Sequence, residues 1–182
     1  MKYYSGADNT ELCPTTAFDL SPLYPENQQP SPDEIAMRIK HYWHPYHQAL
    51  SDTLKQLKQK HNKVVLLDAH SILSQVPRFF EGKLPDFNFG TADGASCDAS
   101  LLKQVKKLNF SPYTSIGNGR FKGGYITRAY GDPKNNIHAI QLELSQRTYM
   151  DEPSNHFNEQ KAEQVKKHLK NFVECLVNFA KN

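Results

Sequence analysis

The fold is decided by one stretch of the sequence, Val64-Val65-Leu66-Leu67-Asp68-Ala69-His70-Ser71. Four apolar residues between two charged ones predict a strand that is buried on both faces, as strands of parallel sheets are. The strand runs directly into Asp-x-His-Ser, and open α/β sheets bind ligands at the carboxyl ends of their parallel strands. We therefore expect the imidazole of His70 to act as a metal ligand or proton carrier, and the alternative is a hydrogen-bonded cap of the strand.

A second apolar run and two helical patterns indicate a layered α/β fold. Residues 137–144 predict another strand, with Glu143 near its end. An amphipathic helix is predicted over residues 158–180, where it would cover one face of the sheet. An earlier helix begins at Pro32 with Ser31 as its N-cap, and Pro45 should kink or split it. The alternation of strands and helices predicts a sheet packed between helices.

Three segments are expected to be loops. Residues 1–32 are rich in proline and have no strand or helix period, so they predict a long extended loop. Residues 71–100, directly after the central strand, are expected to form one wall of an active site. A glycine-rich segment, residues 117–124, permits close backbone approach to a ligand. Between the loops we expect a helix near residues 99–108, a strand within 113–118 and a helical turn over 125–130.

Composition narrows the class of protein. The formal net charge of +3 is small and the basic residues are spread along the chain, which argues against nucleic-acid binding. No apolar run approaches the roughly 18 residues that span a membrane, and no leader opens the chain. The cysteines, Cys13, Cys97 and Cys175, suggest neither a disulfide framework nor a zinc knuckle, and Cys97 is expected to be a buried thiol. We expect one cytoplasmic domain over residues 1–182.

Histidines, carboxylates and cations provide the candidate chemistry. Glu143 could take the proton of a metal-bound water and His70 could be a ligand of that metal, with Asp68 orienting the imidazole. His41, His44 and His47 lack a carboxylate at ligand spacing, so we expect them on a surface or in packing. Arginine forks suit a small anionic substrate, and the alternative is solvated surface charge. The candidate cations are Arg78, Arg120, Lys122, Arg128 and Arg147, of which Arg120 and Lys122 stand out beside glycines and Asn118.

Six longer motifs carry a resemblance that covers Tyr4 to about Ala180. They are Tyr42-Trp43-His44-Pro45-Tyr46-His47, Asp68-Ala69-His70-Ser71, Pro77-Arg78-Phe79-Phe80-Glu81-Gly82, Gly90-Thr91-Ala92-Asp93-Gly94-Ala95-Ser96-Cys97, Gly119-Arg120-Phe121-Lys122-Gly123-Gly124-Tyr125-Ile126-Thr127-Arg128 and Gln141-Leu142-Glu143-Leu144-Ser145-Gln146-Arg147-Thr148-Tyr149-Met150. In these motifs the sequence resembles the N-formylglutamate amidohydrolase (N-formylglutamate deformylase) family.

The resemblance implies a fold, a reaction and a metal. The reaction is hydrolysis of N-formyl-L-glutamate to formate and L-glutamate in histidine degradation, and the fold is similar to that of zinc carboxypeptidases, with a mixed, mostly parallel sheet. His70 matches the place of the last metal ligand and Glu143 that of the catalytic glutamate. A divalent metal, expected to be zinc, is implied. We expect Asp68 and Ser71 to support the ligand. The expected substrate contacts are Arg78, Asn118, Arg120, Lys122 and Arg128.

The family also has a front section that this sequence lacks. It contains a Pro-His-x-Gly motif and an acidic residue, which are expected to supply the other metal ligands, and an early strand or two of the sheet. We therefore expect residues 1–182 to be the carboxyl-terminal two-thirds of such a domain, to bind metal weakly or not at all, and to be poorly active. The alternative is an inactive remnant, or a module that binds a small anion without a catalytic metal.

Overall fold

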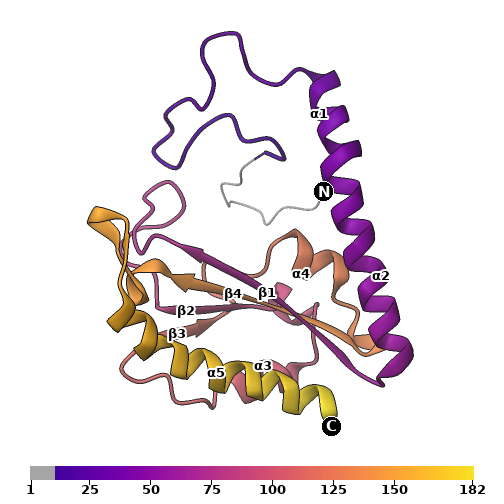
Figure 1. Cartoon of the computed structure of the whole chain (residues 1–182). Helices are drawn as coiled ribbons and strands as arrows, with labels where there is room; N and C mark the ends of the chain where they lie inside the picture. Colours follow the sequence, from indigo (N-terminus) through magenta and orange to yellow (C-terminus); the bar gives the residue numbers. More distant parts are fainter. Residues whose placement is uncertain (1–10) are drawn as a thin grey trace. The chain divides into compact units, whose positions relative to one another are not determined.

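The computed structural model describes residues 11–182, which divide into two compact units (Figure 1). The smaller unit contains residues 11–53 and 75–82, and the sheet unit contains residues 54–74 and 83–182. The prediction of a single domain over residues 1–182 stays a prediction.

The smaller unit consists of two loop segments and the helical stretch over residues 32–53. Residues 11–31 form the predicted loop, with one isolated bridge between Thr16 and Pro22, while residues 1–10 of that prediction lie outside the described residues. Helix α1, Pro32–Arg38, begins as expected, because the Ser31 hydroxyl accepts a hydrogen bond from the Glu34 N–H.

The first helix is divided just before Pro45, in line with the expected kink or split, although the chain stays helical there. A π-helical turn, η1, Ile39–Trp43, joins α1 to α2, His44–Lys60. The N–H of His44 bonds to the carbonyl of Ile39, so the ladder changes register one residue before the proline that cannot donate to it. The rings of His44 and His47 pack at 5.1 Å and 4.1 Å from that of Trp43, in agreement with the packing interpretation of these histidines.

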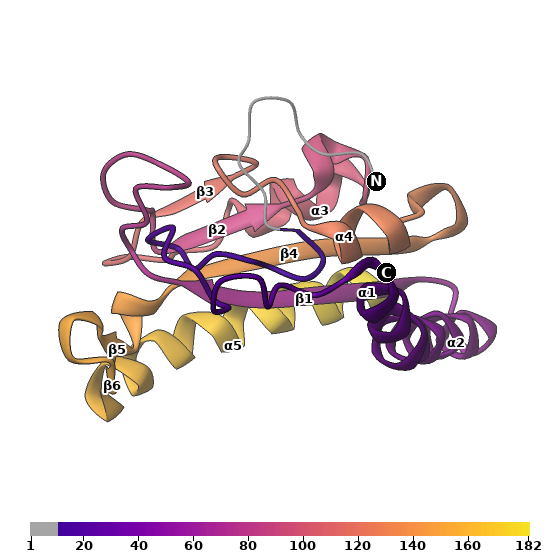
Figure 2. The same ribbon diagram turned by 90° about the horizontal axis from the view of Figure 1, so that it is seen from above.

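The sheet unit contains a mixed, mostly parallel sheet, as expected from the sequence. Its strands are β1, Val64–Ile72, β2, Phe87–Gly90, β3, Ser115–Gly117, and β4, Ile137–Ser145, in the order β1-β4-β2-β3 (Figure 2). The pairs β1–β4 and β2–β3 are parallel, and only β2–β4 is antiparallel. A second, two-stranded sheet pairs β5, Met150–Asp151, with β6, His156–Phe157.

Helices lie on both sides of the larger sheet. Helices α3, Ala99–Val105, and α5, Glu159–Lys181, lie on one side, and α4, Tyr125–Tyr130, lies on the other (Figure 1). The core forms under α3 and α5, where apolar side chains of β2 and β4 meet those of the helices; it includes Phe87, Phe89, Leu101, Ile140, Leu142, Leu144, Val165 and Phe172. No helix among residues 11–182 has both the length and the apolar character that crossing a bilayer requires.

Two predictions about the strands were wrong in part. The central strand β1 is not buried on both faces, because it lies at one edge of the described sheet and Val65, Leu66 and Leu67 are only half-buried. It also extends to Ile72, since it pairs with β4 along its whole length, and His70 therefore lies within the strand. Residues 71–100 are not one loop, because they contain β2, whose four residues are too few to reveal a period.

Candidate functional site

Two neighbouring parallel strands bring His70 and Glu143 together. His70 of β1 pairs in register with Glu143 of β4, and Asp68 pairs with Gln141. Side chains alternate along a strand, so these four residues share one face, opposite to the core face of Leu142 and its neighbours. The sheet therefore places the predicted imidazole and carboxylate side by side.

The imidazole of His70 is held by Asp68 on the same strand. His70 Nε2 lies 2.7 Å from Asp68 Oδ1, and the Asp68 side chain is 7% exposed. This hydrogen bond raises the pKa of His70, while partial burial opposes the rise. The hydroxyl of Thr127 in α4 donates to Asp68 Oδ2 at 3.4 Å. Asp68 is thus positioned to orient the imidazole, as expected.

Glu143 has a buried carboxyl group with a raised pKa. The residue is 7% exposed, and burial raises the pKa of its carboxyl to about 7, against smaller opposing effects of His70 and of a hydrogen bond from Gln141 Nε2 to Glu143 Oε2. That hydrogen bond is 3.0 Å long. A carboxyl group with a pKa near neutrality can both take and return a proton at physiological pH.

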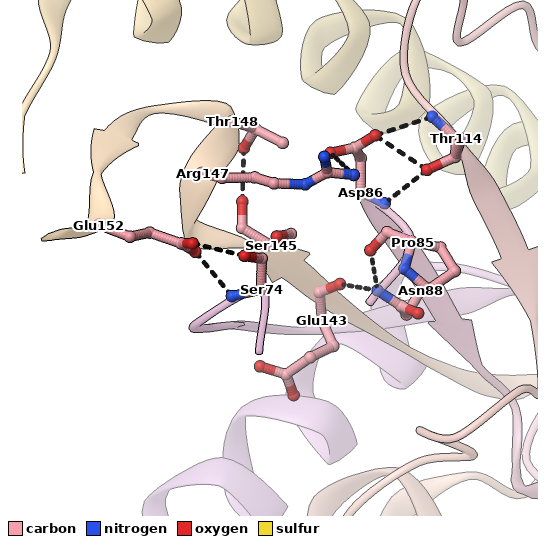
Figure 3. A network of polar contacts seen from close by, with 10 residues as sticks. All are labelled: Ser74, Pro85, Asp86, Asn88, Thr114, Glu143, Ser145, Arg147, Thr148 and Glu152. Carbon is pink, nitrogen blue, oxygen red and sulfur yellow. Dashed lines mark hydrogen bonds and ion pairs between the residues drawn. The ribbon is translucent and has the colours of Figure 1, made fainter. Parts of the chain in front are cut away.

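The backbone of Glu143 is fixed by the neighbouring strand. The side-chain amide of Asn88 in β2 donates to the Glu143 carbonyl at 3.0 Å and to the Pro85 carbonyl at 2.7 Å. Figure 3 shows that the Glu143 carboxyl group points away from Asn88. The strand is therefore anchored on one side, while the reactive group faces the other.

Arg147 belongs to a structural network and not to the face of Glu143. Its guanidinium pairs with Asp86 at 2.9 Å, and the other oxygen of Asp86 accepts hydrogen bonds from the N–H and hydroxyl of Thr114 (Figure 3). A nearby bond runs from the Ser145 N–H to the Asp86 carbonyl. These contacts join the end of β4 to the residues that directly precede β2 and β3. Arg147 therefore has a structural role.

The glycine-rich segment is folded against the sheet next to the site. The Gly124 N–H donates to the Gln141 Oε1. A Cβ on Gly90 would lie 2.5 Å from the Gly123 nitrogen, so the glycine permits this close approach of two backbones. The glycine-rich segment was expected to approach a ligand closely. Its contact with Gln141 places it next to the face of the sheet that carries Glu143.

The polar residues of this segment already contact neighbouring groups. The Asn118 amide bonds with Thr91, and Lys122 pairs with Asp93 at 2.9 Å. Arg128 donates to the Gly123 carbonyl at 2.6 Å. The Arg120 guanidinium lies 5.6 Å from the ring centre of Phe121.

Two further predicted site residues, Arg78 and Ser71, are held by other contacts. Arg78 belongs to the smaller unit, where its guanidinium donates to the Thr16 hydroxyl and the Ala17 carbonyl at 3.0 Å and 2.9 Å. The Ser71 hydroxyl lies 2.7 Å from that of Tyr149. As the residue after His70 in the strand, Ser71 points to the opposite face.

Cys97 is buried as expected, and burial raises the pKa of its thiol to about 11.

Sequence reasoning missed three residues that hold the site. They are Gln141, Thr127 and Asn88, which bond to Glu143 Oε2, Asp68 Oδ2 and the Glu143 carbonyl. A signal existed for Gln141 alone, since it precedes Glu143 by two residues in a strand and must share its face. The other two contacts depend on how distant segments pack.

The described residues do not complete the expected metal centre. Residues 11–182 contain no group of three His, Cys, Asp or Glu side chains that could hold a metal ion. A zinc site normally has at least three protein ligands. His70 would supply one, but its Nε2 is hydrogen bonded to Asp68.

Comparisons with known proteins agree on one family. The family model of N-formylglutamate amidohydrolase matches residues 2–150. N-formylglutamate deformylases of Pseudomonas putida and Pseudomonas aeruginosa are each 48% identical over 151 residues, which is 82% of this chain and 56% of theirs. The crystal structure of N-formylglutamate amidohydrolase from Ralstonia eutropha JMP134 matches with a TM-score of 0.70 and 25% identity, over 88% of this chain and 57% of that one. The chain spans just over half the length of these relatives.

Proposed function

Because the chain belongs to the N-formylglutamate amidohydrolase family, we propose that it hydrolyses the formamide bond of N-formyl-L-glutamate, giving formate and L-glutamate. The observation that carries the proposal is the placement of His70 beside Glu143 in register on adjacent parallel strands. In a cell that degrades histidine, this reaction would be a step of that degradation.

Glu143 is the general base of the proposed reaction. Its carboxylate takes a proton from water, the resulting hydroxide oxygen bonds to the formyl carbon, and the carbonyl oxygen becomes an oxyanion. The protonated Glu143 then gives its proton to the amide nitrogen, the carbon–nitrogen bond breaks, and L-glutamate leaves. A pKa raised to about 7 by burial suits both proton transfers, because neither the acid nor the base form is strongly preferred near neutral pH.

Cationic side chains would bind the two carboxylates of the proposed substrate. Arg120, Lys122 and Arg128 all lie in or just after the segment that Gln141 ties to the face of Glu143. Arginine binds carboxylates through two parallel hydrogen bonds, and a cation near the formyl oxygen would stabilise the oxyanion. We propose these three residues, with Asn118, as the substrate contacts.

A zinc ion with His70 as one ligand is part of the proposal, but residues 11–182 do not complete its coordination. Further ligands would have to come from outside these residues. The chemistry derived above therefore depends on Glu143 alone for water activation.

The incomplete metal centre favours one second candidate, a module that binds a small anion without turning it over. The two candidates are separated by measuring binding and formate release on the same protein. Isothermal titration with N-formyl-L-glutamate gives binding, and a formate dehydrogenase assay gives turnover, each with and without added zinc.

Formate release supports the hydrolase, and zinc-dependent release adds support for the metal. Saturable binding without formate under either condition supports the anion-binding module. N-formyl-L-leucine, which has one carboxylate, is the matched control ligand, and equal binding or turnover of both compounds would contradict the proposed cationic contacts.

A further inference from the structure

Gln141 is a buried side chain whose two polar atoms are both engaged at the site. The residue is 5% exposed. Its amide nitrogen donates to Glu143 Oε2 at 3.0 Å, and its amide oxygen accepts from the Gly124 N–H. One side chain thus connects the proposed base with the backbone of the glycine-rich segment.

The contact with Gly124 fixes which way the amide faces. A backbone N–H can bond only to the amide oxygen, so the NH₂ group of Gln141 must face Glu143. Gly124 is itself held in place, because it is the N-cap of α4 and the carbonyl of Lys122, two residues earlier, accepts from the Ala92 N–H at 2.6 Å. The orientation of the amide is therefore determined by backbone atoms and not by solvent.

We propose that Gln141 is a positioning residue that holds one oxygen of Glu143 and so presents the other to the reacting water. Within residues 11–182, Glu143 Oε2 is the oxygen that accepts this hydrogen bond, and Oε1 has no hydrogen-bond partner. A carboxylate pinned at one oxygen keeps a single orientation, and small losses of alignment at a reacting group cost large factors in rate. The inference rests on the proposed role of Glu143 as base.

Two substitutions separate orientation from folding. Gln141→Met keeps the length of the side chain and removes both hydrogen bonds. Gln141→Glu keeps an oxygen for the Gly124 N–H and offers Glu143 no donor when both carboxyl groups are ionised. Ser145→Ala is the matched control, because Ser145 is fully buried, lies on the same face of β4 two residues beyond Glu143, and has a hydroxyl without a partner among the described residues.

The first measurement is steady-state formate release. We expect both Gln141 variants to lower kcat by about 10- to 100-fold, since the alignment of the base is lost, and Gln141→Met also to raise KM, since it releases the segment that carries the proposed substrate contacts. Ser145→Ala should leave both constants unchanged. A Gln141→Met variant with raised KM and unchanged kcat would overturn the proposal.

The second measurement needs no activity. The carboxylate stretching bands of Glu143 are obtained as the infrared difference between the chain and its Glu143→Gln variant at about pH 9, where the carboxyl group is ionised. We expect these bands to shift in both Gln141 variants and not in Ser145→Ala. Identical bands in all three proteins would refute the role of Gln141. Absence of formate release by the unsubstituted chain would contradict the proposed function instead, and the infrared result would still decide the role of Gln141.

Discussion

Glu143→Gln should stabilise the folded chain above neutral pH. Glutamine has the size of glutamate, its side-chain oxygen can still accept the hydrogen bond from Gln141, and it carries no charge to bury. Burial raises the pKa of Glu143 from its ordinary value of 4.5 to about 7, so the folded state favours the protonated form. Buried carboxylates of this kind are typical of sites that lower stability for the sake of reactivity.

The size and pH range of the effect follow from the two pKa values. Below about pH 4.5 the carboxyl group is protonated in both the folded and the unfolded chain, and Glu143 does not lower the free energy of unfolding. As the pH rises to about 7, the unfolded chain loses its proton first and stability falls, by about 3 kcal/mol in total at about 1.4 kcal/mol for each pH unit. Glu143→Gln should recover that amount above pH 7.

The assay is urea unfolding of both proteins, followed by circular dichroism at several pH values from about 4.5 to 9. The difference in unfolding free energy isolates Glu143, because the other titrating groups are common to both chains. Glu163→Gln is the matched control, since Glu163 is exposed on α5 and should show little change at any pH. A Glu143→Gln variant no more stable than the unsubstituted chain at about pH 9, or a difference that does not vary with pH, would refute the reasoning.

Three further predictions concern the scaffold of the sheet unit. Burial lowers the pKa of His138, so the unfolded chain takes up a proton first as the pH falls below about 6.5. The free energy of unfolding should therefore decline below that pH. His138→Gln should make this decline smaller when both proteins are unfolded in urea. Asp86→Ala leaves the Arg147 guanidinium without its carboxylate and should cost about 3 kcal/mol in the same assay, whereas an unchanged midpoint would show that the network is dispensable. Gly90→Ala would place a Cβ 2.5 Å from the Gly123 nitrogen, so it should lower the free energy of unfolding by about 1–3 kcal/mol and speed amide hydrogen exchange at Gly123. An unchanged exchange rate at Gly123 would contradict the close approach.

Long periodic segments could be predicted from the sequence because their pattern depends only on local spacing. The strand β4, the turn α4 and the helix α5 lie within one or two residues of the predicted ranges. A joint role of His70 and Glu143 was expected from their chemistry and from the resemblance, whereas the parallel pairing of β1 with β4 that brings them together was not predicted.

What could not be predicted depends on contacts between distant segments. The strand β2 has too few residues to show a period, and it forms because Phe87 and Phe89 fill the core under α3 and α5. The role of Asn88 requires knowing that β2 lies antiparallel to β4. Arg147 was a candidate for substrate binding because sequence alone does not reveal its partner Asp86, 61 positions earlier in the chain.

The central claim is that Glu143 supplies the base at a site where substrate also binds. The most direct test compares the unsubstituted chain with Glu143→Gln for binding of N-formyl-L-glutamate and for formate release, under identical zinc conditions. We predict that the variant binds the substrate with similar affinity and releases formate at least about 100-fold more slowly. Near-normal formate release by the variant would contradict the claim.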